Sequence, residues 1–295
     1  MHLSMHNWMR PEPLEMTVRR LARFGYESIE ISGEPERYDT QEVRALLKRH
    51  GIRCWGSVTL MLGVRNLIGR EPAQRAASVR YVKDCVTMVK ELDGFELTVV
   101  PGTVGKVVPD ATPEVEWGWA VETMREIYDH AEAAGVRLAI EPINRFETYF
   151  VNRCAQAVAL AEATGPNCGV CLDAFHINIE EADPLQSIRE AGDRLVDFHV
   201  ADNNRMACGM GNWDWAELVA TLREVGYDDA LTVEFVAPID RTPADPHPGV
   251  VEAAPADATP EELQFILDHG SSVVTEAFYE QLVEKCAQTL MPLIR

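Results

Sequence analysis

Short apolar runs alternate with helix-period segments along the whole chain, and this alternation restricts its fold more than any other feature. Eight strand-like runs occur, and amphipathic stretches separate them. Several of these stretches end in a glycine shortly before the next apolar run, as in FGYESIEI, AGVRLAI and VGYDDALTVEF. Eight strand–helix units in succession predict an α/β fold, a (β/α)8 TIM barrel, with residues 1–295 forming a single domain.

An open doubly wound sheet is the competing architecture, and the first strand–helix connection argues against it. Such a sheet usually carries a glycine-rich phosphate loop after its first strand, and HNWMRPEPL is nothing like one. The expected strands lie at 2–8, 28–32, 53–60, 95–101, 137–143, 168–174, 195–201 and 230–236. The expected helices lie at 13–24, 40–50, 73–92, 115–134, 153–164, 184–192 and 214–225. A final helical stretch at 262–294 either closes the barrel or divides into two helices around His269 and Gly270.

Net charge and composition exclude several classes of partner. The chain carries a net charge of −20, which repels a phosphate backbone and disfavours nucleic acid. No run approaches the ~18 consecutive apolar residues of a membrane span, and the N-terminus lacks a signal-peptide run. Seven scattered cysteines include a CxxC at Cys168 and Cys171, but inside an expected buried strand this pair is weak support for a zinc or redox site. We therefore expect no membrane association and a cytoplasmic location.

One segment, residues 237–262, interrupts the rhythm between the eighth strand and the last helix. It is rich in Pro, Ala and Asp, and in a barrel it would be an inserted βα loop on the face where the strands end. Loops of this length are uncommon unless they are functional or mobile. The segment is therefore either a surface excursion, a lid over that face or a contact with another subunit.

Four successive strands in the second half of the chain each deliver one metal-ligand type of residue at or near their C-terminal end. These residues are Glu141 in LAIEPI, Asp173 in VCLDAF, His199 in DFHVAD and Glu234 in LTVEF. Their spacings of 32, 26 and 35 residues are each about one strand–helix unit, so the four side chains converge on one face of a barrel. Buried charges need partners, and three carboxylates with one imidazole suit a divalent cation such as Mn²⁺, Mg²⁺ or Co²⁺.

Such a set of oxygen and nitrogen ligands suits the vicinal oxygens of a hydroxy-carbonyl substrate. A cation there polarises the carbonyl and stabilises the cis-enediolate that forms when the neighbouring C–H proton leaves. Glu141 and Glu234 are the candidates for removing that proton and for delivering one to the other face.

The loops that follow these strands are rich in hydrogen-bonding groups and predict a sugar site. Trp8 and His6 on the first strand could face the barrel mouth, and aromatic faces stack on sugar rings. Trp55, Trp117 and Trp119 are further aromatic candidates at strand ends or in the following loops. The polar candidates in the loops are Arg145, Glu147, Asn152, His176, Asn178, Asn203, Asn204 and Arg205.

In these residues the chain resembles the xylose-isomerase-like sugar isomerase/epimerase superfamily, and most of all its ketose 3-epimerase branch. The likeness in layout covers roughly residues 1–236 and is sharpest in EPINRFETYFVN, LDAFHINIEE, DFHVADNNR and the closing VEF. The resemblance implies an unphosphorylated keto-sugar as substrate, Mn²⁺ as the favoured metal and a homo-oligomer. It also implies roles for residues of this chain: metal ligands Glu141, Asp173, His199 and Glu234, an acid/base pair Glu141 and Glu234, and substrate contacts Glu147, His176 and Arg205.

The chain also departs from the epimerase pattern, in its opening MHLSMHNWMR and in the long 237–262 segment. Three alternatives therefore stay open. The same scaffold serves the catalytic subunit of C-glycoside deglycosidases, lyases that act on 3-oxo-glucosides together with a small second subunit. A histidine close after the first ligand glutamate would favour that chemistry, and Ile143 and Asn144 stand there instead. The others are a metal nuclease of the AP-endonuclease type, which needs more histidines, and a non-catalytic sugar-binding barrel.

Overall fold

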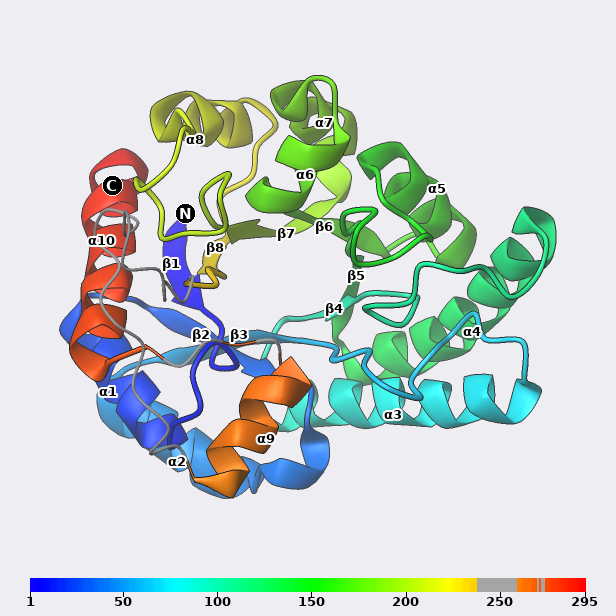
Figure 1. Ribbon diagram of the computed structural model, residues 1–295, viewed down its shortest axis with the longest axis horizontal. Coiled ribbons are helices and arrows are strands. Elements are labelled where there is room, and N and C mark those ends of the chain that lie inside the picture. The colour runs from blue at the N-terminus through cyan, green and yellow to red at the C-terminus, as the bar shows by residue number, and fades with distance from the viewer. Residues whose placement is uncertain (238–258, 270, 272–273) are drawn as a thin grey trace, which may run out of the picture.

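Eight parallel strands form one sheet in the order β1-β8-β7-β6-β5-β4-β3-β2, and helices surround it on the outside (Figure 1). A parallel bridge between His6 and Glu30 brings the two ends of the sheet together. This computed structural model describes residues 1–237, 259–269, 271 and 274–295. The predicted single-domain (β/α)8 TIM barrel is confirmed.

All eight strands occur where the sequence predicts them, and nearly all their residues are buried. Most are shorter at the C-terminal end than predicted, because the chain leaves the sheet there to enter the loops that carry the polar residues. The strands are β1 His2–Met5, β2 Ser28–Ser32, β3 Arg53–Val58, β4 Glu96–Val99, β5 Arg137–Ile140, β6 Gly169–Asp173, β7 Leu195–Val200 and β8 Ala230–Val233.

The seven predicted helices are confirmed to within two residues at each end. They are α1 Leu14–Arg23, α2 Thr40–His50, α3 Pro72–Glu91, α4 Pro113–Ala134, α5 Cys154–Thr164, α7 Pro184–Ala191 and α8 Trp215–Glu224. The last stretch divides in two, as α9 Pro260–His269 and α10 Glu276–Ile294. The sequence did not predict the short helix α6, Ala174–Glu180, or the single-turn helices η1, Pro35–Arg37, and η2, Gly192–Arg194.

The helix ends explain why the chain breaks where it does. Asp39 caps α2 by accepting hydrogen bonds from two first-turn backbone N–H groups. Gly51 and Gly135 end α2 and α4 with φ of 69° and 75°, a left-handed conformation that glycine adopts without a steric penalty. The glycine stops seen in the sequence are therefore the points at which the chain turns from a helix into the next strand.

The interior of the barrel contains polar groups as well as apolar ones. Glu96 on β4 is fully buried, and its carboxylate lies against the backbone of Gly56 on β3. A Cβ atom at Gly56 would be 1.9 Å from Glu96 Oε1, so the strand needs glycine at this position. The barrel thus accommodates a carboxylate beneath the face where the strands end.

Several sequence predictions concern features outside the barrel itself. Most of the 237–262 segment, residues 238–258, lies outside the described residues. The seven cysteines are buried free thiols, and Cys168 and Cys171 form no disulfide. Among the described residues, no helix has the length and apolarity that crossing a bilayer requires.

Candidate functional site

The four predicted ligands meet at the C-terminal end of the barrel strands. Glu141 and Glu234 directly follow β5 and β8, whereas Asp173 ends β6 and His199 lies near the end of β7. One potential ligand atom from each lies within 4.8 Å of the corresponding atoms of the others. All four side chains are buried, and they come from four consecutive strands.

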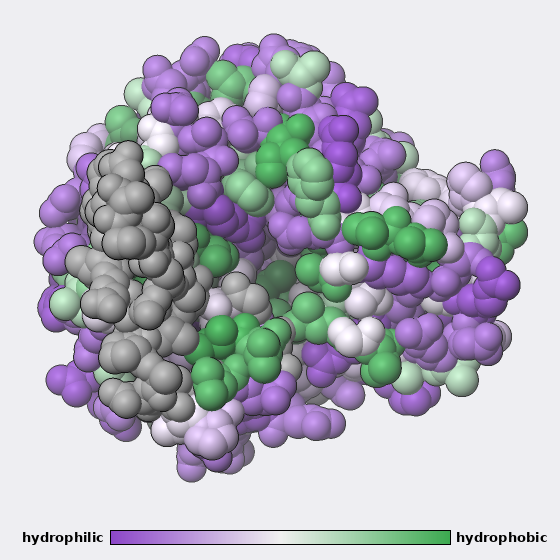
Figure 2. All heavy atoms as spheres, viewed as in Figure 1, coloured by the Kyte–Doolittle hydropathy of each residue, from purple (hydrophilic) through white to green (hydrophobic). Residues whose placement is uncertain are grey.

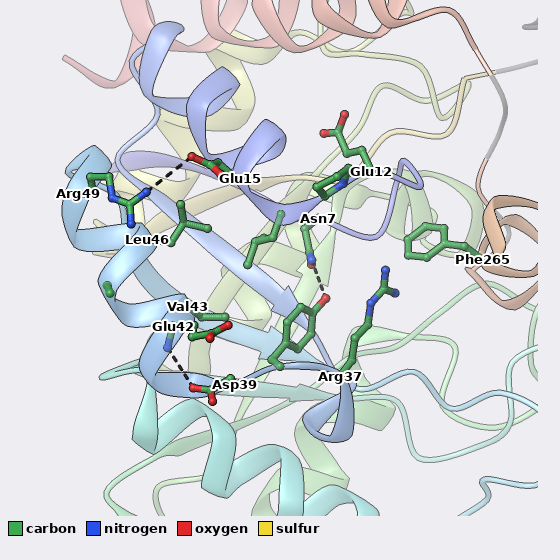
Figure 3. A pocket seen from close by; sticks show the side chains of 14 residues that line it. Asn7, Glu12, Glu15, Arg37, Asp39, Glu42, Val43, Leu46, Arg49 and Phe265 are labelled. Atoms are coloured by element: carbon green, nitrogen blue, oxygen red, sulfur yellow. Dashed lines mark hydrogen bonds and ion pairs between the residues drawn. The ribbon is translucent and has the colours of Figure 1, made fainter. Parts of the chain in front are cut away.

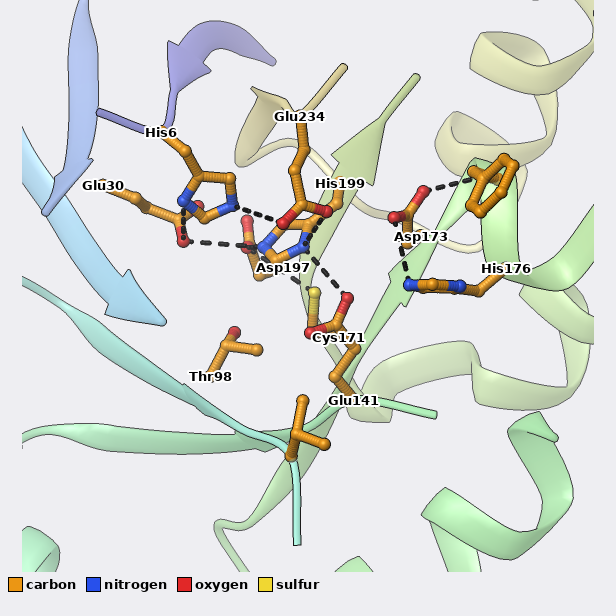
Figure 4. A network of polar contacts seen from close by, with 12 residues as sticks. His6, Glu30, Thr98, Glu141, Cys171, Asp173, His176, Asp197, His199 and Glu234 are labelled. Atoms are coloured by element: carbon orange, nitrogen blue, oxygen red, sulfur yellow. Dashed lines mark hydrogen bonds and ion pairs between the residues drawn. The ribbon is translucent and has the colours of Figure 1, made fainter. Parts of the chain in front are cut away.

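The two ring nitrogens of His199 face different groups (Figure 4). Its Nδ1 atom is 3.1 Å from Glu141 Oε1 and 3.5 Å from Glu234 Oε2. Its Nε2 atom is 3.0 Å from Asp197 Oδ2 and 3.5 Å from Glu30 Oε2, deeper in the barrel. The Nδ1 side of the ring therefore belongs to the cluster of four ligands.

Burial and crowding shift the pKa values of these groups. Burial raises the pKa of Asp173 to about 7, although Arg205 opposes the shift. Burial also raises the pKa of Glu141. For His199 burial acts in the opposite direction, yet the Cys171 thiol and the surrounding carboxylates raise its pKa well above the ordinary range. Burial thus makes Asp173 and Glu141 harder to ionise in the bare protein.

A divalent cation would offset the cost of ionising these buried carboxylates. Three carboxylates and one imidazole nitrogen form the kind of donor set that hard or borderline divalent ions take. The donors are buried and already within 4.8 Å of one another, so little rearrangement is needed to surround an ion. The residues present therefore fit the metal that the resemblance implies.

The two carboxylate oxygens of Asp173 make different contacts. Its Oδ1 atom accepts a hydrogen bond of 2.7 Å from the backbone N–H of Phe175 and thereby caps α6. Its Oδ2 atom faces the site, 3.6 Å from His176 Nε2 and 2.9 Å from Arg205 Nη1. The unpredicted helix α6 thus begins at a predicted ligand and places His176 beside it.

The loop after β5 carries Glu147 to the same site. Asn144 links it to α6, because its Nδ2 atom donates 2.7 Å to Glu147 Oε1 and lies 2.9 Å from His176 Nδ1. Val151 closes the loop with φ of 56°, an unusual conformation for a β-branched residue. Asn152 supports that turn by donating hydrogen bonds to two backbone carbonyls of the loop. Asn152 therefore shapes the loop instead of facing a ligand.

The loop after β7 places Arg205 over the cluster of ligands. The guanidinium donates 2.9 Å to Asp173 and 3.2 Å to Glu234, and its Nη1 atom is 3.3 Å from His176 Nε2. The buried carboxylate of Asp202 organises this loop by accepting hydrogen bonds from Gly209, Trp213 and Trp215, among others. Arg205 itself has φ of 61°, so the backbone is held in an uncommon conformation where the side chain enters the site.

A cavity of about 110 Å³ opens above these residues. Figure 2 shows the hollow near the middle of this face, with hydrophobic residues on its rim. One end of the cavity is polar and contains Glu141, Glu234, Glu147, His176 and Arg205. The remaining lining is mostly apolar, and its residues are Trp8, Val58, Thr59, Leu60, Met61, Leu62, Val100, Val104, Ile143 and His269.

Other predicted residues lie in different places. His6 has no exposed surface and lies behind Glu234, with Nε2 3.7 Å from Glu234 Oε1 and Nδ1 3.6 Å from Glu30 Oε2. Trp55 is buried lower in the barrel, where its indole N–H donates to Asp197. Arg145 is exposed and pairs with Glu180. The remaining candidates away from the cavity are Trp117 against Phe150, Trp119 under Arg75, exposed Asn178 and the loop residues Asn203 and Asn204.

A wider groove of about 620 Å³ lies between α1, α2 and α9 (Figure 3). Charged groups on its wall pair with each other, as Arg49 does with Glu15 at 3.7 Å. Tyr38 on the same wall accepts a hydrogen bond from Asn7. The described residues of this groove form no cluster of potential metal ligands, whereas those at the barrel mouth do.

Among the polar residues around the site that sequence reasoning missed are Asn144, Asp197 and His269. Asn144 and Asp197 each stand close in sequence to a predicted residue, and strand alternation could have found Asp197, two positions before His199. His269 reaches the cavity from α9, and its Nε2 atom is 3.1 Å from Glu34 Oε2. No local signal in the sequence links α9 to the barrel mouth.

Comparison with known proteins agrees with the fold. The family model for the xylose isomerase-like TIM barrel matches residues 18–269. L-ribulose 3-epimerase of Mesorhizobium japonicum is 30% identical over 75% of this chain and 75% of that enzyme. D-psicose 3-epimerase of Agrobacterium fabrum is 31% identical over 74% of this chain and 77% of that enzyme.

A solved structure extends the likeness to the whole chain. D-psicose 3-epimerase from Clostridium cellulolyticum, crystallised with D-tagatose, superposes with a TM-score of 0.83. The two proteins share 20% identity, and the superposition covers 100% of each chain, so the structural match concerns the fold. With the family model and the two curated relatives, these findings place the chain in the xylose isomerase-like TIM-barrel family, among its sugar epimerases and isomerases.

Proposed function

We propose that this protein is a divalent-metal-dependent ketose 3-epimerase that acts on an unphosphorylated keto-sugar. The observation that carries the proposal is the convergence of Glu141, Asp173, His199 and Glu234, whose potential ligand atoms lie within 4.8 Å of one another. Two of these residues, Glu141 and Glu234, also line the cavity and are available for proton transfer.

The same four residues would hold the cation, and Mn²⁺ is the ion we expect. When bound, such an ion polarises a substrate carbonyl and stabilises negative charge on its oxygen. The chain itself supplies the proton transfers. One of the two glutamates removes the proton from the carbon beside the carbonyl, and the other returns a proton to the opposite face. Arg205 and His176 would bind the substrate oxygens next to the reacting carbon.

Substrate orientation would come from the polar end of the cavity. Glu147 accepts from Asn144, and Asn144 also contacts His176, so these side chains are fixed before a sugar arrives. Pre-positioned hydrogen-bonding groups lower the cost of orienting a flexible substrate. Trp8 would cover the apolar part of the sugar.

The cavity favours a sugar without a phosphate group. Among the described residues that line it there is no lysine, and its single arginine, Arg205, already pairs with two carboxylates. The wall formed by Met61, Leu62 and Val104 is apolar and offers no charge to a phosphate. Binding of a doubly charged group at that end is therefore unfavourable.

Elimination from a 3-oxo-glucoside is the reaction that the experiment must separate from epimerisation. The structure places buried Ile143 and Asn144 after Glu141, and Asn144 is engaged with Glu147 and His176. Neither side chain is an acid that could protonate an aglycone or a base that could deprotonate one. We therefore propose that the carbon skeleton stays intact and that the proton returns to carbon.

The test combines metal analysis with proton exchange. Purified protein is analysed for bound metal, stripped, and reloaded separately with Mn²⁺, Mg²⁺ and Co²⁺. Each form is incubated in D₂O with D-fructose, D-tagatose, D-psicose, L-ribulose and a 3-oxo-glucoside, and exchange at each carbon is followed by NMR. We expect deuterium at C3 of at least one ketose, only in a metal-loaded form. Absence of bound metal together with absence of exchange would contradict the proposal, and aglycone release from the 3-oxo-glucoside would establish the lyase instead.

A further inference from the structure

A buried carboxylate, that of Asp197, lies beside the ring of His199 on the side that faces away from Glu141 and Glu234. Asp197 and His199 are two residues apart on β7, so both side chains point into the barrel. Both are fully buried, and Asp197 Oδ2 is 3.0 Å from His199 Nε2. The next acidic oxygen, Glu30 Oε2, is 3.5 Å from the same nitrogen. Asp197 Oδ2 is therefore the nearer of these two acidic oxygens to His199 Nε2, a buried nitrogen that forms no hydrogen bond of standard geometry in this structure.

Asp197 is itself fixed by a residue from another strand. The indole N–H of Trp55 on β3 donates 3.1 Å to Asp197 Oδ1. This contact leaves the second oxygen, Oδ2, directed at His199. Asp197 Oδ1 thus accepts from Trp55 on β3, whereas Oδ2 lies beside His199 on β7 and also accepts, at 3.7 Å, from the Cys171 thiol on β6.

A neutral imidazole carries one proton, and its position decides which nitrogen can bind a metal. His199 Nδ1 faces Glu141 and Glu234, so this nitrogen must be unprotonated if it is to act as a ligand. The proton then belongs on Nε2, where only a buried acceptor can satisfy it. Carboxylates in this position fix the ring and the tautomer of metal-binding histidines in other proteins.

We propose that Asp197 is a positioning residue, which accepts the Nε2 proton of His199 and keeps Nδ1 free and aimed at the metal. This inference rests on the proposed function, because it assumes that the four ligands hold a cation. Asp197 does not line the cavity, so its effect on a bound metal would pass through His199.

The variant that tests this is Asp197→Asn. An asparagine offers one acceptor oxygen to three neighbours, the Trp55 indole, the Cys171 thiol and the His199 ring, so at least one of them loses its partner. Glu96→Gln is the matched control, because Glu96 is an equally buried carboxylate inside the same barrel and accepts a hydrogen bond from Thr98 instead. Metal-free wild type and both variants are titrated with Mn²⁺ by calorimetry, and circular dichroism verifies the fold.

We expect the Kd for Mn²⁺ to rise about 10- to 100-fold in D197N and to stay within about threefold of wild type in E96Q. The tautomer supplies a readout independent of affinity. In Mg²⁺-loaded wild type labelled with ¹⁵N-histidine, long-range ¹H–¹⁵N correlation should show His199 protonated at Nε2, with a proton shifted downfield by a strong acceptor. That signal should move upfield or vanish in D197N and persist in E96Q.

The possible negative results of these experiments contradict different parts of the proposal. Equal Mn²⁺ affinities of wild type and D197N would overturn the role of Asp197 while leaving the metal site intact. A wild type that binds no divalent ion would overturn the proposed function as well. If D197N does not fold, the spectrum of the loaded wild type decides alone, because a His199 without a proton on Nε2 contradicts the inference.

Discussion

The Nη1 atom of Arg205 donates a 2.9 Å hydrogen bond to Oδ2 of Asp173, so a predicted substrate-binding cation is anchored on a predicted metal ligand. Shortening this side chain to alanine would remove the cation and leave the buried carboxylate without its partner. We expect Arg205→Ala to lower kcat/KM by about 100-fold or more, as loss of a charge-stabilising donor does elsewhere. Steady-state kinetics on the ketose that exchanges fastest measures this effect.

The control for this prediction is Arg145→Ala on the loop after β5. Arg145 is also an arginine paired with a carboxylate, but its partner is Glu180 and its side chain is exposed. Its loss should change kcat/KM less than about threefold, because surface ion pairs contribute little. Equal effects of the two substitutions would contradict a substrate-binding role for Arg205.

Metal removal should lower the thermal stability of the protein. Burial raises the pKa values of Asp173 and Glu141, so a bound cation would offset part of the cost of ionising them. A cation that binds only the folded state at 100 times its Kd adds about 2.7 kcal/mol to the free energy of unfolding. Differential scanning calorimetry with EDTA and with Mn²⁺ should therefore give midpoints several degrees apart. Glu141→Gln should narrow that gap, and identical midpoints for the wild type would argue against a metal site.

The buried carboxyl of Glu30 predicts a stability that declines with rising pH. Burial, with a further contribution from Asp197, raises the pKa of Glu30 to about 8. In an unfolded chain the pKa of glutamate is about 4.3. Between these values the folded protein retains a proton that the unfolded chain has lost. The contribution of Glu30 to the free energy of unfolding therefore falls as pH rises towards about 8.

Glu30→Gln removes this titration and should flatten the profile. Urea unfolding of metal-free protein at pH 5, 7 and 9 measures the free energies for wild type, Glu30→Gln and the exposed control Glu27→Gln. We expect the difference between wild type and Glu30→Gln to grow in favour of the variant towards pH 9. Parallel profiles would mean that Glu30 is ionised in the folded protein at neutral pH.

Gly56 and Gly118 should respond to alanine in opposite directions. A Cβ atom at Gly56 would be 1.9 Å from Glu96 Oε1 and 2.5 Å from the Glu96 backbone carbonyl, so the strands must separate. We expect Gly56→Ala to cost about 2 kcal/mol or more, in the range of overpacked cores. Gly118 is exposed within α4 and has no atom near its Cβ position, so alanine should add about 0.5–1 kcal/mol. Chemical denaturation of both variants tests the pair.

Much of the fold could be predicted because local signals and global architecture agree. The glycine stops at Gly51 and Gly135 mark where helices end, and every strand follows from its apolar run. Helix α6 escaped prediction because it spans only seven residues and starts at the last residue of a strand pattern. Its start depends on the Asp173 side chain, whose role as a cap is hidden while the residue is read only as a ligand.

The convergence of the four predicted ligands could be foreseen because barrel topology brings regularly spaced strand ends together. The depth at which a side chain lies within the barrel could be predicted less reliably. His6, expected at the mouth, lies behind Glu234, and Trp55, expected near a sugar ring, is the partner of Asp197 lower down. A strand pattern says which side chains point inward, but their level along the barrel axis depends on register between strands.

The double duty of Asp173 affects how related sequences should be interpreted. Because one of its oxygens begins α6, a descendant that abandoned catalysis would still lose local stability by replacing it. Retention of aspartate at this position is thus a poor diagnostic of activity. Glu141 and Glu234 cap no helix in the described part of the chain, so their survival in a relative is the better indicator that the chemistry has been kept.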